Sequence, residues 1–163
     1  MTDAAPAIFV TLEQSGFAAA IRQSLWIYPA ANVGHIVSLT LFAGALAVTD
    51  VRLLGGLAAT SPAFLLARAR SVAVAALAGM AVTGCVLFSA EASHLVLNPA
   101  FQLKVVLVAA GLINVAIYEL WAKRAVERLA PGASMPARAK VAGGLSLGIW
   151  VAVAACGRSI AYF

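Results

Sequence analysis

Long apolar segments separated by short polar connections dominate the chain. Four of them, at about residues 26–48, 71–90, 100–121 and 141–160, are long enough to cross a bilayer. A helix needs about 20 apolar residues to span the ~30 Å hydrocarbon core. The pattern therefore predicts an all-α fold, a four-transmembrane-helix bundle that forms a single integral membrane domain over residues 1–163.

Turn-forming residues lie between these segments. Gly55 and Gly56 favour a loop after the first span, and Asp50 and Arg52 are taken to mark the exit of that span. Pro62 is a credible entry to the second helix, and Pro99 is expected to open the third. Apolar residues between positions 8 and 22 fall on one helical side. They predict a short N-terminal amphipathic helix at the membrane interface, and a lead-in without a partner is the alternative.

The composition agrees with lipid as the main solvent of the chain. Hydrophobic residues make up 63% of the sequence, charged residues only 10%, and the mean hydropathy is +0.98. These values exclude an ordinary soluble globular domain. The start of the chain lacks a signal-peptide pattern and is expected to be retained. Cys85 and Cys156 lie in apolar stretches and match no metal-binding spacing.

The distribution of cations predicts an orientation. One side of the membrane would carry eight of them, and the other three; they are Arg52, Arg68, Arg70, Lys123, Arg124, Arg128, Arg138 and Lys140 against Arg22, Lys104 and Arg158. The side with more Lys and Arg is normally cytoplasmic. Both termini of this multi-pass chain are therefore expected outside the cytoplasmic face of the membrane. The sequence has no basic run with interleaved aromatic residues, so nucleic-acid binding is not expected.

Small residues predict how the helices associate. Gly144 and Gly148 form a small-xxx-small pattern, which in membranes permits close backbone approach. We interpret it as a packing face within the bundle, with a dimer seam as the alternative. The first interpretation implies that Gly148→Leu would loosen the bundle.

Two histidines are the main candidates for chemistry. His35 lies ~9 residues, or roughly 13 Å, inside the first span, and His94 follows the second span on the same side of the membrane. Two imidazoles on adjacent helices are the minimum ligand set for a b-type haem, with Gly34 and Gly84 making room and Lys104 and Arg158 pairing with the propionates. The estimated depths of the imidazoles differ by on the order of 10 Å, which works against a shared iron.

Alternatives to haem remain open at this point. His35 could simply bond to a neighbouring helix through Asn32, Asn114, Tyr118 or Ser38. Glu119 could serve a proton path or pair with Lys123 at i+4. No catalytic motif is found, so enzymatic activity is uncertain, and hydrolase and kinase functions have no support.

Several segments together resemble an uncharacterised family of small bacterial inner-membrane proteins with a domain of unknown function. They are Tyr28-Pro29, His35-Ile36, the sequence DVRLLG at residues 50–55 and the sequence NPAFQLK at residues 98–104. The resemblance covers roughly residues 10–125, and the fourth span is similar only in being hydrophobic. It implies a four-helix membrane protein with His35 in the family pattern, and no activity.

The leading functional hypothesis is a membrane module that binds haem b or takes part in redox chemistry, with His35 and His94 as iron ligands. A cofactor-free accessory subunit that docks a partner is the main alternative, and a small-solute transporter is less favoured because no inverted repeat is found. The expected partners are the lipid bilayer and a homo-oligomer or larger membrane complex.

Overall fold

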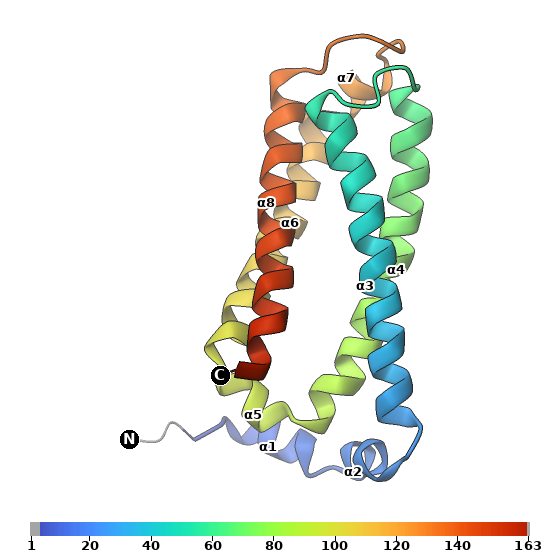
Figure 1. Cartoon of the computed structure of the whole chain (residues 1–163). Helices are drawn as coiled ribbons and strands as arrows, with labels where there is room; N and C mark the ends of the chain where they lie inside the picture. The colour runs from blue at the N-terminus through green and yellow to red at the C-terminus, as the bar shows by residue number, and fades with distance from the viewer. Residues whose placement is uncertain (1–3, 163) are drawn as a thin grey trace.

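The computed structural model describes residues 4–162, and within this range the chain is helical without strands (Figure 1). The all-α prediction is confirmed. In chain order the elements are α1 (Ala7–Glu13), α2 (Gly16–Gln23), α3 (Ile27–Leu54), α4 (Pro62–Ala90), α5 (Ala92–Leu97), α6 (Pro99–Trp121), α7 (Lys123–Glu127), α8 (Ala137–Ser159) and the 3-10 turn η1 (Ile160–Tyr162).

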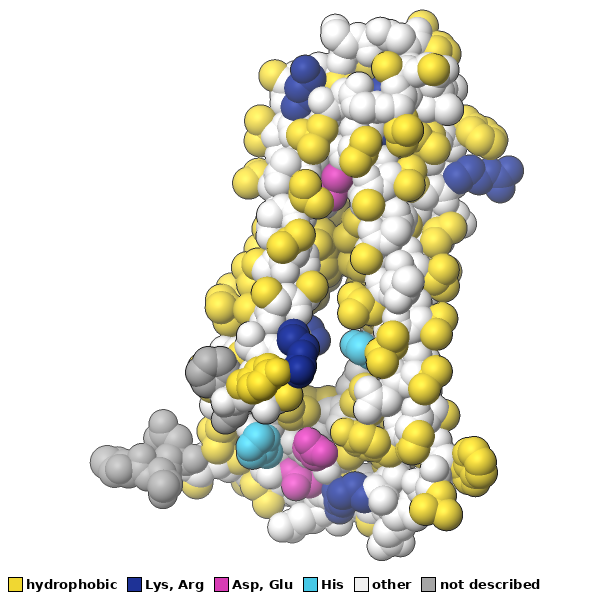
Figure 2. Space-filling model, viewed as in Figure 1, with side chains coloured by type: hydrophobic (Ala, Val, Ile, Leu, Met, Phe, Trp, Pro, Cys, Tyr) yellow, Lys and Arg dark blue, Asp and Glu magenta, His cyan; other side chains and the backbone are white. Residues whose placement is uncertain are grey.

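Four long helices form the bundle, and each is long and apolar enough to cross a membrane. They are arranged as two pairs: α3 packs along α4, α6 packs along α8, and α3 also contacts α8. The α3–α4 loop and α7 lie at one end, and both chain ends lie at the other (Figure 1). Hydrophobic side chains, including Ile36, Val74, Val106 and Val151, are exposed on the outer faces, as in a bundle surrounded by lipid (Figure 2).

The first long helix extends beyond the predicted span. α3 continues to Leu54, and both Asp50 and Arg52 are buried, at 2% and 0% exposure. The helix ends in a Schellman motif: Gly55 has a positive φ of 108°, and the amide of Gly56 donates to the carbonyl of Val51. The two charged residues lie in the last turns of this helix, where neighbouring helices and the loop enclose them.

The other helix ends differ less from expectation. α4 begins at Pro62 as predicted, and it therefore starts nine residues before the predicted span. Pro99 opens α6 as predicted, and the Asn98 side chain caps this helix by accepting from the amides of Ala100 and Phe101. α6 ends at Trp121, and Ala122 separates it from α7.

The N-terminal segment forms two short helices instead of one continuous helix over residues 8–22. Ser15 separates them and caps α2 by accepting from the amide of Ala18. The segment is attached to the bundle at two points. The Glu13 carboxylate accepts from the backbone amide (2.7 Å) and the hydroxyl of Ser93, and Arg22 donates to the carbonyl of Ala90 at 3.0 Å.

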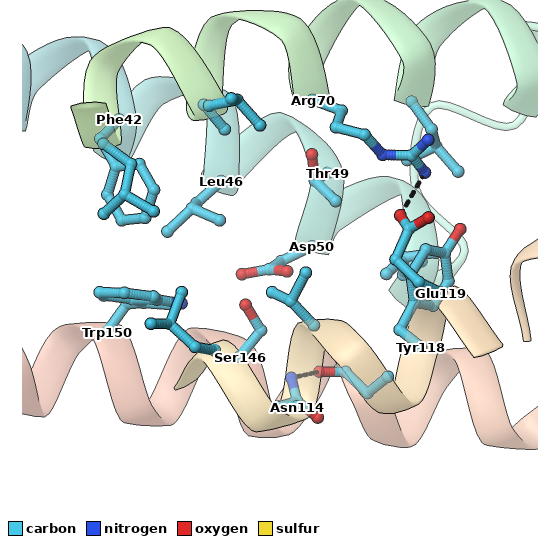
Figure 3. Close-up of a pocket in the computed structure, with 18 residues that line it drawn as sticks. Phe42, Leu46, Thr49, Asp50, Arg70, Asn114, Tyr118, Glu119, Ser146 and Trp150 are labelled. Carbon is cyan, nitrogen blue, oxygen red and sulfur yellow. Dashed lines mark hydrogen bonds and ion pairs between the residues drawn. The ribbon is translucent and has the colours of Figure 1, made fainter. Parts of the chain in front are cut away.

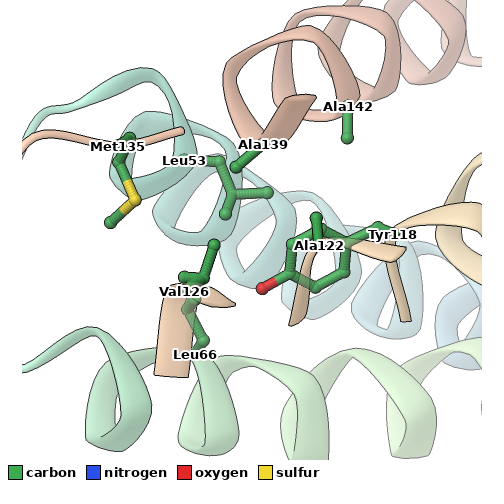
Figure 4. Packing of buried hydrophobic residues seen from close by; sticks show 8 residues of the cluster. All are labelled: Leu53, Leu66, Tyr118, Ala122, Val126, Met135, Ala139 and Ala142. Carbon is green, nitrogen blue, oxygen red and sulfur yellow. The ribbon is translucent and has the colours of Figure 1, made fainter. Parts of the chain in front are cut away.

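A hydrophobic core closes the loop end of the bundle (Figure 4). Its buried members come from all four long helices, α7 and the following loop; they are Leu53, Leu66, Tyr118, Ala122, Val126, Met135, Ala139 and Ala142. This cluster holds the two helix pairs together at that end.

The small-residue prediction fails at Gly144 and Gly148, although other glycines of the long helices make close contacts, such as Gly79, where an added Cβ would lie 2.6 Å from Ser38 Oγ. A Cβ added at Gly148 would meet nothing within 4 Å, and one at Gly144 would reach only the Leu54 side chain at 3.9 Å. Gly143 is the close contact instead, because its Cβ would lie 2.9 Å from Leu53 Cβ and 3.3 Å from the Asp50 carbonyl oxygen. The helix face that packs on α3 is therefore offset by one residue from the Gly144–Gly148 stripe.

Candidate functional site

A cavity of about 770 Å³ opens between the two helix pairs at the end that carries the chain termini. Figure 2 shows a hollow there, with histidine and Lys or Arg side chains on its sides. Three of the four predicted site residues, His35, His94 and Lys104, line this cavity. The apolar part of its wall is formed by Leu87, Phe88, Leu95 and Phe101.

His35 is held by a threonine of the neighbouring helix. Its Nδ1 lies 2.9 Å from the Thr83 hydroxyl oxygen, and that hydroxyl donates its proton to the Gly79 carbonyl at 2.7 Å. A hydroxyl has a single proton, and with that proton on the Gly79 carbonyl Thr83 accepts from Nδ1–H of His35; this hydrogen-bond network is the basis for assigning the Nδ1–H tautomer. A neutral imidazole in this arrangement carries its free lone pair on Nε2.

None of the expected partners of His35 is its observed partner. Sequence reasoning proposed asparagine, tyrosine or serine side chains, whereas the bond goes to Thr83 on α4. The sequence held one signal for this contact: Thr83 and Gly84 are adjacent, and a small residue beside a hydroxyl suits a helix interface.

Glycines allow the close approach around the imidazole. A Cβ at Gly84 would lie 3.4 Å from His35 Cε1, and one at Gly34 would lie 3.2 Å from the Thr83 methyl group. Only Gly84 lines the cavity, so Gly34 serves the α3–α4 contact and does not widen the cavity as expected.

The two predicted propionate partners are placed differently. Lys104 lines the cavity, with its Nζ over Gly157, where an added Cβ would be 3.5 Å away. Arg158 is exposed and does not line the cavity; its guanidinium donates to the Tyr162 hydroxyl at 2.6 Å and stacks on that ring. Tyr162 itself is part of the cavity wall, so Arg158 contacts the wall through Tyr162 and not the cavity directly.

His94 is exposed on α5 at the mouth of the same cavity. His94 lies closer to the terminal end of the bundle than His35 does. His35 bonds to Thr83 within α4, whereas His94 follows the end of α4 at Ala90. The seven residues between Thr83 and Ala90 correspond to about 10 Å along a helix. Within residues 4–162 there is no group of three His, Cys, Asp or Glu side chains that could hold a metal ion on its own.

A second cavity, of about 130 Å³, lies nearer the loop end and is lined by all four long helices (Figure 3). The edge-to-face pair Phe42–Trp150, with ring centroids 4.7 Å apart, separates it from the first cavity along the bundle. Gly111 makes room for the indole, since a Cβ there would lie 2.8 Å from the Trp150 ring.

Charged side chains flank this second cavity. Glu119 lies between two cations, with Arg70 at 2.7 Å and Lys123 at 2.7 Å, so the expected i+4 pair with Lys123 is present. The Arg70 pair also joins α4 to α6. Sequence reasoning missed Asp50 as an interior residue because a charged pair near a span end normally marks the interface.

The comparisons with known proteins point to one family. Neither curated proteins nor solved structures gave a match. A family model matches residues 12–163, which includes α8 and so extends beyond the segments on which the resemblance was based. The chain therefore belongs to a family of unknown function, DUF6644.

Proposed function

We propose that this protein is a membrane-embedded haem b-binding module, with His35 as the axial ligand in the cavity at the terminal end. The observation that supports this most is the Gly79–Thr83–His35 hydrogen-bond chain. Iron-ligating histidines commonly donate their other ring N–H to an oxygen acceptor, which fixes the ring and raises its basicity. Here Nδ1–H is fixed in that way, and Nε2 is the nitrogen free to bind iron.

The chemistry of the cavity suits an amphipathic planar group. A volume of about 770 Å³ falls in the range of roughly 300–1,000 Å³ that is typical of ligand pockets. Phe88 and Phe101 stack at 5.4 Å and form an aromatic wall, and Lys104 supplies a cation for a propionate. Arg158 would reach a propionate only by leaving Tyr162. Haem b, when bound, would supply one-electron transfer.

His94 is the weaker of the two proposed ligands. It lines the cavity at the mouth, and the depth difference of about 10 Å favours His35 as the only strong ligand. The variant His94→Ala decides this point: a low-spin haem spectrum that becomes high-spin would assign His94 as the second ligand.

The test is the absorption spectrum of detergent-purified protein expressed with adequate haem supply. We expect a Soret band and a reducible α-band at one haem per chain, both lost in His35→Ala. Thr83→Val removes only the hydroxyl and should weaken haem binding by about 10–100-fold, as for other outer-shell partners. Thr40→Val is the matched control, because the Thr40 hydroxyl bonds only to Ile36 of its own helix. A stable, colourless preparation would refute the proposal.

The same hydrogen bond favours one second candidate, a cofactor-free accessory subunit. The His35–Thr83 contact joins α3 to α4 and would stabilise this pair without any ligand. In that case Thr83→Val lowers the thermal stability of a colourless protein, and Thr40→Val does not.

We further propose a bacterial inner-membrane location with both termini on the periplasmic side. The eight cations counted in the sequence belong to the loop end, and three belong to the end with the termini. Single cysteines at residues 16 and 132, in a background without Cys85 and Cys156, test the orientation. The proposal requires an impermeant maleimide added to intact spheroplasts to label position 16 and spare position 132.

A further inference from the structure

The cavity near the loop end contains a carboxyl group without a counter-ion. Asp50 is 2% exposed, lines this cavity, and its Oδ2 has no hydrogen-bond partner. Within the described part of the chain, no Lys, Arg or His nitrogen lies within 4.0 Å of its carboxyl oxygens. An ionised carboxylate in such surroundings is costly unless a cation accompanies it.

The nearby cations are already engaged. Arg70 lines the same cavity, but its guanidinium is paired with Glu119 at 2.7 Å. Arg52 is buried two residues further along α3 and donates to the loop carbonyls of Gly56 and Thr60 at 3.5 and 3.3 Å. The charge of Asp50 is therefore left for a group from outside the chain.

Most of the rest of the cavity wall is apolar or aromatic, and its other charged members, Arg70 and Glu119, are paired with each other. Phe42 and Trp150 close one end, and Figure 3 shows Ser146 pointing toward Asp50 from α8. Aromatic faces attract cations, so they favour the same sign of charge as the carboxylate does. A cavity of about 130 Å³ is close in size to one of roughly 150 Å³ that binds benzene in another protein.

The cavity also has a route from the lipid. Val74 on α4 and Val115 on α6 line it and are at the same time 62% and 41% exposed on the outside of the bundle. Apart from the Arg70–Glu119 ion pair and the Phe88–Phe101 stack near the terminal end, α4 and α6 pack little against each other. A ligand that partitions into the hydrocarbon region can enter between these helices.

We infer that this cavity is a binding site for a small lipid-partitioning organic monocation, such as a protonated aromatic amine, anchored by Asp50. The ammonium group donates to the unpartnered Oδ2, and the apolar body fills the space between Phe42, Trp150 and the aliphatic wall. The site is separate from the haem cavity and does not depend on it.

Fluorescence of Trp150 tests this inference directly. The chain has three tryptophans, so Trp26→Phe and Trp121→Phe leave the one in the cavity wall as the only reporter. Benzylammonium is the probe, and ethylbenzene is its neutral counterpart of similar size. We expect a saturable change with benzylammonium, about tenfold weaker binding in Asp50→Asn, and no effect of Asp50→Asn on ethylbenzene.

Two further variants keep the test decisive. Glu13→Gln removes a carboxylate at the opposite end of the bundle and should leave benzylammonium binding unchanged. Ala73→Phe fills the cavity while Asp50 stays in place, and it should abolish binding even if Asp50→Asn does not fold. Equal affinity in all variants would overturn the inference. So would a signal that follows pH alone, because the site would then bind only a proton.

Discussion

The contact of Gly143 with α3 leads to a quantitative prediction for a matched pair of glycine variants. At Gly143 an added methyl group would lie 2.9 Å from Leu53 Cβ and 3.3 Å from the Asp50 carbonyl oxygen. Neither atom belongs to the flexible end of a side chain, so relief requires α3 and α8 to separate. At Gly148 the same methyl group meets nothing within 4 Å.

The expected magnitudes follow from two opposing contributions. Replacing a mid-helix glycine with alanine stabilises a helix by about 0.5–1 kcal/mol in both variants. Forcing an extra methyl into a packed contact costs about 1–3 kcal/mol, and this applies only at Gly143. We therefore expect Gly148→Ala to be stabilised by up to about 1 kcal/mol and Gly143→Ala to be less stable than it by about 1–3 kcal/mol.

The free energy of unfolding can be measured by titration with SDS in mixed micelles, followed by circular dichroism. Both proteins should show the same helical signal before the transition, which excludes a failure of membrane insertion. Equal midpoints for the two variants would refute the argument that Gly143, and not the Gly144–Gly148 stripe, is the packing face. Destabilisation of Gly148→Ala alone would restore the interpretation made from the sequence, or indicate a dimer seam at that residue.

Two further predictions concern single polar contacts. The Ser93 hydroxyl and backbone amide hold the pKa of Glu13 below its ordinary value. The contact therefore stabilises docking of α1 above pH ~4.5 and is lost as the pH falls through the lowered pKa. Relative to the intrinsic exchange rate at each pH, protection of the Ser93 amide should fall with acid in the wild type and be low at every pH in Glu13→Gln, and identical protection profiles would contradict this. The Asn114 side chain donates to the Ala142 carbonyl at 3.0 Å and so joins α6 to α8. Asn114→Leu should therefore lower the free energy of unfolding in the SDS titration by about 0.6 kcal/mol. Asn32→Leu, at an exposed position, is the control, and an equal loss in both variants would contradict the prediction.

The sequence was sufficient to predict the four long helices because their signal is continuous. In a chain with so little charge, apolar stretches of this length have few alternatives to a membrane-spanning helix. Pro99 also indicated the start of α6 correctly. Helix ends were harder to predict. Hydropathy alone placed the second span from residue 71 because Arg68 and Arg70 precede it, whereas Pro62 indicated the start of the helix correctly.

The candidate site was predictable only in part. Depth along the helix identified His35 as an interior residue, but depth does not reveal the rotation of a helix about its axis, and so the partner Thr83 was missed. The rotation of a helix also determines which glycines make close contacts, since a shift of one residue moves a side chain by about 100° around a helix. Asp50 was missed for a related reason: enclosure by α8 is a tertiary property that its neighbours in sequence do not encode.

His35 and Asp50 lie on the same helix and both line interior cavities, yet they are too far apart to act as one site. Fifteen residues separate them, which corresponds to about 22 Å along α3, and the Phe42–Trp150 pair lies between the two cavities. Sites separated by more than about 10 Å without shared partners usually behave additively. Loss of haem in His35→Ala should therefore leave benzylammonium binding intact, and Asp50→Asn should leave the haem spectrum intact. A change in either direction would mean that the aromatic pair transmits a rearrangement between the cavities, and the two halves of the bundle would then have to be treated as one functional unit.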